Sequence, residues 1–212
     1  MGQAAVKTQR LRDALAYRRP DRIPAGEAFW TGFLRRCQAR WGEDFDPYRA
    51  FDLDYVIMVP NLDPRLQEFE VLSQDGEDIV VRTGFGATIR RSGDKPMPHF
   101  ESFSINRPEE MADFAFDPPD DPRRFFAGGD DQLNGVGDAL ARNLPSWEAR
   151  LKPYVEDFAI FGGICEPYEY LWRIIGSENA LIWMASEPAA LGAFIDRVGE
   201  FLLAALKAQI AA

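Results

Sequence analysis

The chain has 212 residues, of which 46% are hydrophobic and 27% are charged, and its formal net charge is −10. Such a composition is typical of a globular protein with a sizeable core, and the acidic balance argues against non-specific contact with nucleic acid or an anionic membrane. No run approaches the roughly 18 apolar residues of a membrane span, and residues 1–19 lack the apolar stretch of a signal peptide, so we expect a cytoplasmic protein.

Apolar spacing predicts alternating helices and buried strands in the first part of the chain. Helices are expected over 7–18 and 29–41, and strands over 22–27 and 54–60. Pro20 and Gly42 are expected to stop the two helices. The second strand leaves through a turn-forming Asn61-Leu62-Asp63-Pro64.

Residues 68–91 change character, because apolar and polar residues alternate on both sides of Asp75-Gly76. This pattern predicts a β-hairpin, with a further strand over 87–90. We interpret 68–91 as an antiparallel insertion between two strands of the main sheet. The stretch over 92–130 is rich in proline and aspartate and is expected to be a connection, with a short helix near 108–114.

A third strand of the main sheet, also buried, is expected at 157–161, Asp-Phe-Ala-Ile-Phe, after a helix around 131–149. Gly162-Gly163 follow it, and helices are then expected over 166–176, 178–185 and 187–209. The apolar stripe of the last helix should pack on the sheet; it comprises Leu191, Phe194, Ile195, Val198 and Leu202. Since glycines allow a ligand to approach the backbone closely, the carboxyl end of strand 157–161 is where we expect a site.

Four stretches in order carry a family resemblance. They are Arg12–Leu15 with Arg19–Pro24, Phe85–Arg91, Phe116–Phe125, and Gly163–Gly176 with Glu178, Leu181 and Glu187-Pro188. Together they resemble the uroporphyrinogen decarboxylase superfamily, which includes decarboxylases of haem biosynthesis and corrinoid-dependent methyltransferases. The resemblance covers nearly the whole chain.

The resemblance implies the fold class α/β, in the form of a partial TIM-like (β/α)8 barrel. A whole barrel needs roughly 250 residues, so we expect 1–212 to be a single domain, the amino-terminal portion with about three barrel strands. The antiparallel insertion at 68–91 would interrupt it. A last strand with an unpaired edge would favour association into an oligomer.

Two departures favour the methyl-transferring branch. The decarboxylases carry an arginine-rich segment after the first strand, because their substrate bears eight carboxylates that need guanidinium partners. This chain has Gly26–Gly32 there, with an acid and no arginine. In addition, Glu166–Glu169 with Trp172 and Gly176 resembles the methyltransferase-like pattern. We therefore expect methyl transfer involving a methylcorrinoid; decarboxylation of uroporphyrinogen and an inactive binding module are the alternatives.

Two acidic residues are the candidate catalytic groups. The resemblance implies that an aspartate on the second strand binds substrate, which points to Asp54, although Asp52 competes and either could simply cap the strand. Glu27 ends the first strand and could accept a proton, or it could be a solvated loop acid.

The candidate substrate-binding residues are Phe29, Trp30, Glu166, Tyr168, Glu169 and Trp172. Trp172 could equally be a packing residue. Glu169 could be a helix-end acid that is favoured by the helix dipole.

No metal site is expected within this chain. A zinc site needs about three protein ligands, and the single histidine, His99, lies far in sequence from Cys37 and Cys165, which we expect to be free thiols. The resemblance implies zinc in the carboxyl-terminal half of the full-length protein. It also implies a small-molecule substrate and a methylcorrinoid on a carrier protein as partner.

Overall fold

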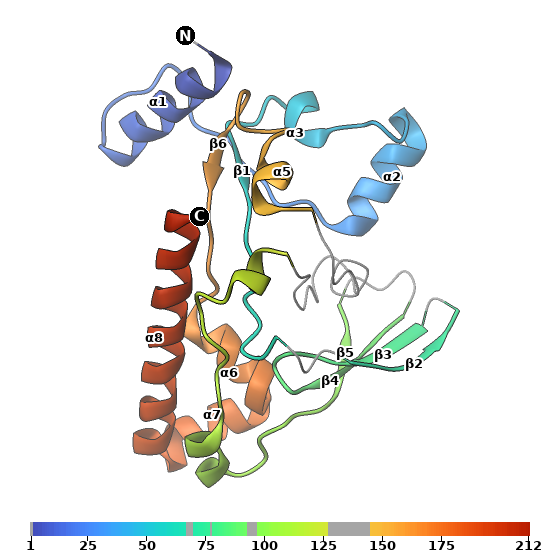
Figure 1. Cartoon of the computed structure of the whole chain (residues 1–212), viewed down its shortest axis with the longest axis vertical. Coiled ribbons are helices and arrows are strands. Elements are labelled where there is room, and N and C mark those ends of the chain that lie inside the picture. Colours follow the sequence, from blue (N-terminus) through green and yellow to red (C-terminus); the bar gives the residue numbers. More distant parts are fainter. Residues whose placement is uncertain (1, 67–69, 77, 93–96, 127–144) are drawn as a thin grey trace. The chain divides into compact units, whose positions relative to one another are not determined.

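The structure is a computed structural model that describes residues 2–66, 70–76, 78–92, 97–126 and 145–212. It is a mixed α/β protein (Figure 1). The chain divides into two compact units: unit 1 is Met1–Val59 with Pro145–Gly163, and unit 2 is Pro60–Leu144 with Ile164–Ala212. The expectation of a single domain over 1–212 stays a prediction.

Unit 1 contains a parallel strand pair. Its elements are α1 (Gln3–Leu15), α2 (Thr31–Trp41), α3 (Pro47–Ala50), β1 (Tyr55–Ile57), α5 (Trp147–Leu151) and β6 (Ala159–Phe161). β1 and β6 run parallel, with Tyr55 opposite Ala159 and Ile57 opposite Phe161. The structure thus confirms a strand within each of the predicted ranges 54–60 and 157–161, and each observed strand is shorter than predicted. The predicted helix over 131–149 falls mostly outside the described residues, and α5 covers its end.

The predicted strand over 22–27 does not form as a regular strand, but its middle lies beside β1. The backbone N–H of Asp54 donates to the carbonyl of Ala25 at 2.7 Å, and the N–H of Ala159 donates to the carbonyl of Asp54 at 3.0 Å. Pro24 has no N–H for a ladder. Gly26 lies so close to the Tyr55 ring that a Cβ there would be 2.0 Å from the Tyr55 Cζ. The 22–25 segment, β1 and β6 are therefore adjacent in that order, and the backbone hydrogen bonds that join them lie at Ala25, Asp54 and Ala159.

Unit 2 contains an antiparallel sheet. Its strands are β2 (Glu70–Asp75), β3 (Asp78–Arg82), β4 (Thr88–Arg91) and β5 (His99–Ser102), paired in that order. This confirms the predicted hairpin and the strand that follows it. β5 was missed, because the proline-rich surroundings of 92–130 favoured a connection. Ile89 of β4 lies opposite Phe100 of β5, and Phe100 packs against the small apolar cluster around Val81.

Helices form most of the larger core of unit 2. In the described part of this unit they are η1 (Pro108–Asp113), η2 (Pro122–Phe125), α6 (Pro167–Ile175), α7 (Ser177–Ser186) and α8 (Pro188–Ala211), and η2 lies outside the core cluster. α6 ends at Gly176, whose φ of +86° suits glycine and where a Cβ would lie 2.9 Å from the Phe103 ring. None of the helices in the described part of the chain is long and apolar enough to cross a bilayer.

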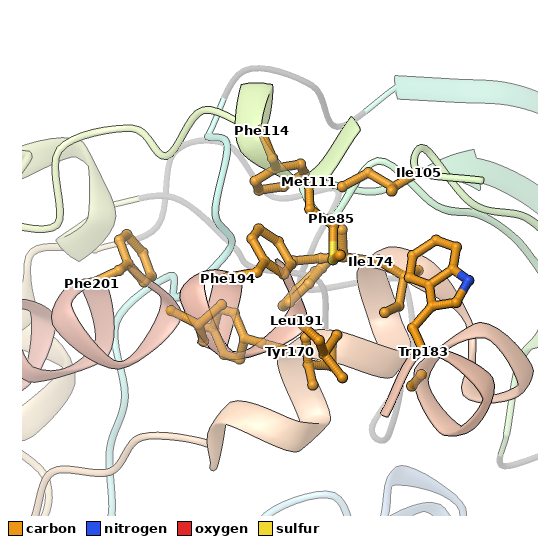
Figure 2. Close-up of a cluster of buried hydrophobic side chains, with 14 of the residues drawn as sticks. Phe85, Ile105, Met111, Phe114, Tyr170, Ile174, Trp183, Leu191, Phe194 and Phe201 are labelled. Atoms are coloured by element: carbon orange, nitrogen blue, oxygen red, sulfur yellow. The ribbon is translucent and has the colours of Figure 1, made fainter. Parts of the chain in front are cut away.

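The apolar stripe of α8 packs differently from the prediction. Leu191, Phe194 and Val198 lie in a core with residues of α6, α7 and η1, including Ile174, Trp183 and Met111 (Figure 2). The expectation that the stripe packs on a sheet is wrong. A helical stripe specifies that a face is buried, but its sequence does not say whether a sheet or other helices cover it.

Candidate functional site

The sequence-predicted site residues fall in both units. Asp54, Glu27, Phe29 and Trp30 belong to unit 1, whereas Glu166, Tyr168, Glu169 and Trp172 belong to unit 2. The geometry of each group is therefore a property of its own unit. A joint site made of both groups stays a prediction.

Asp54 is the centre of a buried ion-pair cluster. Its side chain is fully buried just before β1. Its Oδ1 accepts from the guanidinium of Arg10 and from Arg22 Nη2 at 3.0 Å, and its Oδ2 accepts from the backbone N–H of Ala25 at 2.7 Å. Arg22 Nη1 also lies 2.9 Å from Oδ2. Because both oxygens are engaged, the carboxylate ties α1 and the 22–25 segment to β1, which is a structural role. Its predicted catalytic role stays a prediction.

Two further acids complete this cluster at its exposed side. Arg10 donates to Asp21 through Nε at 2.6 Å and Nη2 at 2.7 Å, and this hydrogen bond lowers the pKa of Asp21 to about 2. Asp52, the competitor of Asp54, is exposed and lies 3.1 Å from Arg22 Nη2 and 3.5 Å from Lys7 Nζ. Its pairing gives it a place in the same structural network.

The other predicted residues of unit 1 lie at the start of α2. Glu27 is exposed, and its Oε1 accepts from the N–H of Ala28 at 2.9 Å. Phe29 is half-buried and packs 5.4 Å from the ring of Phe33. Trp30 occupies the N-cap position of α2 and is 41% exposed. An accessible acid and an accessible indole thus lie within four residues of sequence.

In unit 2, the first turn of α6 brings together the predicted acidic and aromatic residues. Glu166 is the N-cap, Pro167 is the first helical residue, and Tyr168 is 39% exposed. Glu169 is half-buried and pairs with Arg173 one turn later, at 3.4 Å between Oε1 and Nη1. We name the set Cys165, Glu166, Tyr168, Glu169 and Arg173 the α6 site.

Trp172 does not belong to this site. Its ring packs edge-on against Phe100 of β5, with 5.3 Å between ring centroids. The packing alternative, considered from the sequence, accounts for its position. Its side chain helps to hold α6 against the antiparallel sheet of the same unit.

The inner residues of the α6 site are held by the core. The guanidinium of Arg173 lies 3.9 Å from the centroid of the Phe85 ring, and Phe85 contacts Tyr170 edge-on at 5.0 Å. Figure 2 shows Phe85 and Tyr170 in the same cluster. Burial, and then the charge of Glu169, raise the pKa of Cys165 to about 11. The thiol is therefore neutral at pH 7 and is a poor nucleophile.

A buried arginine positions the loop that follows β1. Arg124 is 1% exposed. Its guanidinium donates to backbone carbonyls of Asn61 at 3.1 Å, Asp63 at 2.7 Å, Asp117 at 3.1 Å and Pro118 at 2.8 Å. In return, the Asn61 N–H donates to the carbonyl of Arg124 at 2.8 Å.

Tyr170 holds the same loop from the α6 side. Its hydroxyl donates to the carbonyl of Leu62, and burial raises its pKa well above the ordinary value, so the phenol is neutral. Sequence reasoning found the turn Asn61–Pro64 but missed Arg124 and Tyr170 as its supports. Since Arg124 pairs with main-chain oxygens and not with an acid, no charge pattern in the sequence announces the contact.

The α6 site therefore presents acids and an aromatic ring, while its cation, Arg173, is already engaged with Glu169. Arg173 is 5% exposed and Arg124 is 1% exposed, so neither guanidinium reaches solvent freely. Within the described ranges, no group of three His, Cys, Asp or Glu side chains is arranged to hold a metal ion. Such a surface can accept protons or hydrogen bonds and can stack an aromatic ligand.

Comparisons with known proteins give no match: no family model, no curated protein and no solved structure matches this chain.

Proposed function

We propose that this chain forms the first strands of a TIM-like barrel in an enzyme of the uroporphyrinogen decarboxylase superfamily, and that it takes part in methyl transfer involving a methylcorrinoid. The proposal starts from the resemblance of the four sequence stretches. The structural support comes from unit 1 for the fold and from the α6 site for the chemistry.

The observation that carries the fold proposal is the order Ala25, Asp54, Ala159, in which a backbone hydrogen bond places the 22–25 segment beside the parallel pair of β1 and β6. Ala25 and Asp54 are joined by a backbone bond, and β1 pairs in parallel with β6, although the antiparallel strands of unit 2 intervene in the sequence. Successive parallel neighbours in chain order are what a barrel requires of its first strands. A helix, α6, follows β6, as in a βα unit.

The engaged cations favour methyl transfer over decarboxylation. Uroporphyrinogen, with its eight carboxylates, would need accessible guanidinium groups. At the α6 site, Arg173 is paired with Glu169, and elsewhere in unit 2 the buried Arg124 is bound to backbone carbonyls. The accessible residues Glu166 and Tyr168 suit a ligand whose contact surface is neutral or positively charged and has a flat face.

The residues of this chain are given limited roles in this proposal. Tyr168 would stack on the bound ligand, and Glu169 would accept a proton or a hydrogen bond beside it. A bound methylcorrinoid would supply the methyl group. The described residues do not include a donor set for zinc, so no zinc ligand is assigned to this chain and no step depends on one.

The test is a titration of the purified protein with methylcobalamin, followed by absorbance. We expect saturable binding that weakens by about fivefold in Tyr168→Ala, because a stacked aromatic contact contributes about 1 kcal/mol. Tyr17→Ala is the matched control, since Tyr17 is 99% exposed and lies in unit 1. Equal weakening in both variants would reject the α6 site as the binding surface.

The alternatives have their own readouts. Turnover of uroporphyrinogen, detected by porphyrin fluorescence after oxidation, would overturn methyl transfer in favour of decarboxylation. If the protein binds neither methylcobalamin nor uroporphyrinogen, the result favours the inactive binding module.

A further inference from the structure

Helix α2 concentrates positive charge in an acidic protein. Its sequence, TGFLRRCQARW, contains Arg35, Arg36 and Arg40 and no acid, whereas the whole chain has a net charge of −10. All three arginines are exposed. Among the residues that the structure describes, none forms an ion pair with them. α2 is drawn in light blue in Figure 1.

Several other arginines of unit 1 form ion pairs, whereas Arg12 and Arg19, like the three arginines of α2, form none with the described residues. Arg10 pairs with Asp21 and Asp54, and Arg49 pairs with Asp157 at 2.8 Å. Arg36 and Arg40 instead lie one turn apart on the same side of α2. Like charges at this spacing cost a few tenths of a kcal/mol in an isolated helix. Among the described residues, no acidic side chain forms an ion pair with these arginines that would offset this cost.

Exposed indoles flank these arginines. Trp41 is 54% exposed, and the guanidinium carbon of Arg40 lies 5.4 Å from the centroid of its ring. Trp41 is also stacked on Phe45 at 4.8 Å, which limits the motion of its ring. At the other end of the helix, Trp30 is 41% exposed. We name Trp30, Arg35, Arg36, Arg40 and Trp41 the α2 surface.

A platform of aromatic rings supports this surface. Phe33 of α2 is stacked on Phe29 at 5.4 Å, and Phe51 lies 6.1 Å from Phe29 and 6.2 Å from Phe45. Since aromatic pairs of this kind restrict one another, the helix presents its side chains from a fixed base. A preorganised surface loses less conformational entropy when it binds a partner.

We propose that the α2 surface docks an acidic surface of a partner protein. Tryptophan and arginine dominate the binding energy of protein interfaces, and complementary charge directs the partner to one face. The rest of this acidic chain would repel the same partner, so α2 would be selected. A nucleic acid is a poorer candidate, because it needs phosphate contacts from a broad basic surface. The proposal concerns unit 1 and goes beyond the proposed chemistry of the α6 site.

The experiment uses a fluorescently labelled glutamate-rich peptide as the acidic probe, at low ionic strength where surface charges are weakly screened. We expect the double variant Arg36→Glu, Arg40→Glu to weaken binding by about tenfold. The matched control is Arg12→Glu, Arg19→Glu, which changes the same charge at two other exposed arginines of unit 1. This control should change the affinity by less than about twofold.

A second variant separates a docking surface from diffuse attraction. Trp41→Ala leaves the net charge unchanged and should weaken peptide binding by about threefold. Circular dichroism checks that each variant is folded, and Arg36→Gln, Arg40→Gln provides a neutral version of the charge change.

Several results would overturn the proposal. They are absence of peptide binding, equal weakening by the two double variants, and no effect of Trp41→Ala. Tighter binding of single-stranded DNA through Arg36 and Arg40 would instead assign the surface to nucleic acid. Preferred binding of uroporphyrin through the same arginines would assign it to a small polycarboxylate.

Discussion

The two units bury charge in opposite ways. In unit 1, a carboxylate, Asp54, is fully buried and receives two guanidinium groups, from Arg10 and Arg22. In unit 2, a guanidinium, that of Arg124, is buried and donates its hydrogen bonds to main-chain carbonyls. The first arrangement joins distant segments through formal charges, whereas the second shapes a single loop through neutral dipoles.

The difference shows where function can reside. A carboxylate whose two oxygens accept hydrogen bonds from guanidinium groups and a backbone amide can bind substrate only if these contacts are lost. Arg124 and Tyr170, by contrast, donate hydrogen bonds to backbone carbonyls of the loop. These contacts do not occupy the other side chains of the loop and of α6, which can therefore contact a ligand. We therefore place the chemistry of the proposed function on the α6 site, with the Asp54 cluster as the support of the parallel strands.

The largest expected effect comes from Asp54→Asn. The substitution removes the buried carboxylate that Arg10 and Arg22 share and leaves Asp21 as the remaining charged partner of Arg10; since each charged hydrogen bond contributes about 1.5 to 3 kcal/mol, we expect a loss of at least about 3 kcal/mol of unfolding free energy. Urea denaturation measures this loss. Asp52→Asn is the matched control: Asp52 has a φ of +47°, which asparagine tolerates, and its pairs are exposed, so less than about 1 kcal/mol should be lost. Similar losses in both would show that Asp54 is not the centre of the cluster.

A somewhat smaller loss is expected for Arg124→Met. The buried carbonyls of the loop after β1 lose a charged donor, and hydrogen bonds of this kind contribute about 1.5 to 3 kcal/mol. Hydrogen exchange should report the loss at the amide of Asn61, which donates to the carbonyl of Arg124. Arg123→Met, which breaks an exposed pair with Asp121, should change neither quantity much. An unchanged Asn61 amide in Arg124→Met would contradict the role given to Arg124.

Removal of the Tyr170 hydroxyl sharpens the comparison within unit 2. Tyr170→Phe deletes the hydrogen bond to the carbonyl of Leu62 and should cost about 1 kcal/mol. Because Arg124 holds the same loop, the two substitutions should not be additive, with a coupling of at least about 0.5 kcal/mol. Additive losses in the double variant would mean that the two supports act independently.

The unfolding free energy at acidic pH should depend on Asp21, which lies at the exposed side of the Asp54 cluster. Asp21 has a pKa of about 2 in the folded protein and 3.8 without its partners. Its contribution is therefore present above pH 4 and is lost as the pH falls from about 4 to about 2. Asp21→Asn should flatten this part of the pH profile of unfolding. An unchanged slope would show that Arg10 does not favour the ionised form of Asp21.

The smallest effect concerns Cys165. Its pKa of about 11, against 9.0 for the free group, predicts slow alkylation by iodoacetamide at pH 8. Since the folded pKa is raised, its contribution to stability is complete below pH 9 and is lost as the pH rises towards 11. Glu169→Gln removes a nearby negative charge and should shift the alkylation profile to lower pH. A profile centred near pH 9 in the parent protein would contradict the burial of the thiol.

Much of the fold could be predicted from periodicity, but the partners of polar residues could not. The strands at 54–60 and 157–161 were expected because short apolar runs with glycine or turn exits are specific signals. β5 was missed because its residues follow a proline-rich stretch and its order comes from pairing with β4. The packing of Leu191 and Phe194 on helices was missed because an apolar stripe in the sequence does not specify which element packs against it.

For the candidate site as well, residues could be predicted from the sequence, but their contact partners could not. Glu166, Tyr168 and Glu169 were predicted because they open a helix after a strand, and α6 does begin at Pro167. Asp54 was predicted because the family resemblance implies a substrate-binding aspartate on the second strand. Its partners Arg10 and Arg22 could not be predicted, because those contacts depend on how α1 packs against β6. Electrostatic contacts between segments far apart in sequence leave no local pattern.

The most direct test of the account measures transfer of the methyl group itself. The protein is mixed with methylcobalamin and a thiol acceptor, and loss of the methyl group is followed by the absorbance of the corrinoid. We predict that the protein accelerates demethylation, that Tyr168→Ala reduces this acceleration, and that Tyr17→Ala leaves it unchanged. Conversion of uroporphyrinogen without any demethylation of methylcobalamin would contradict the account.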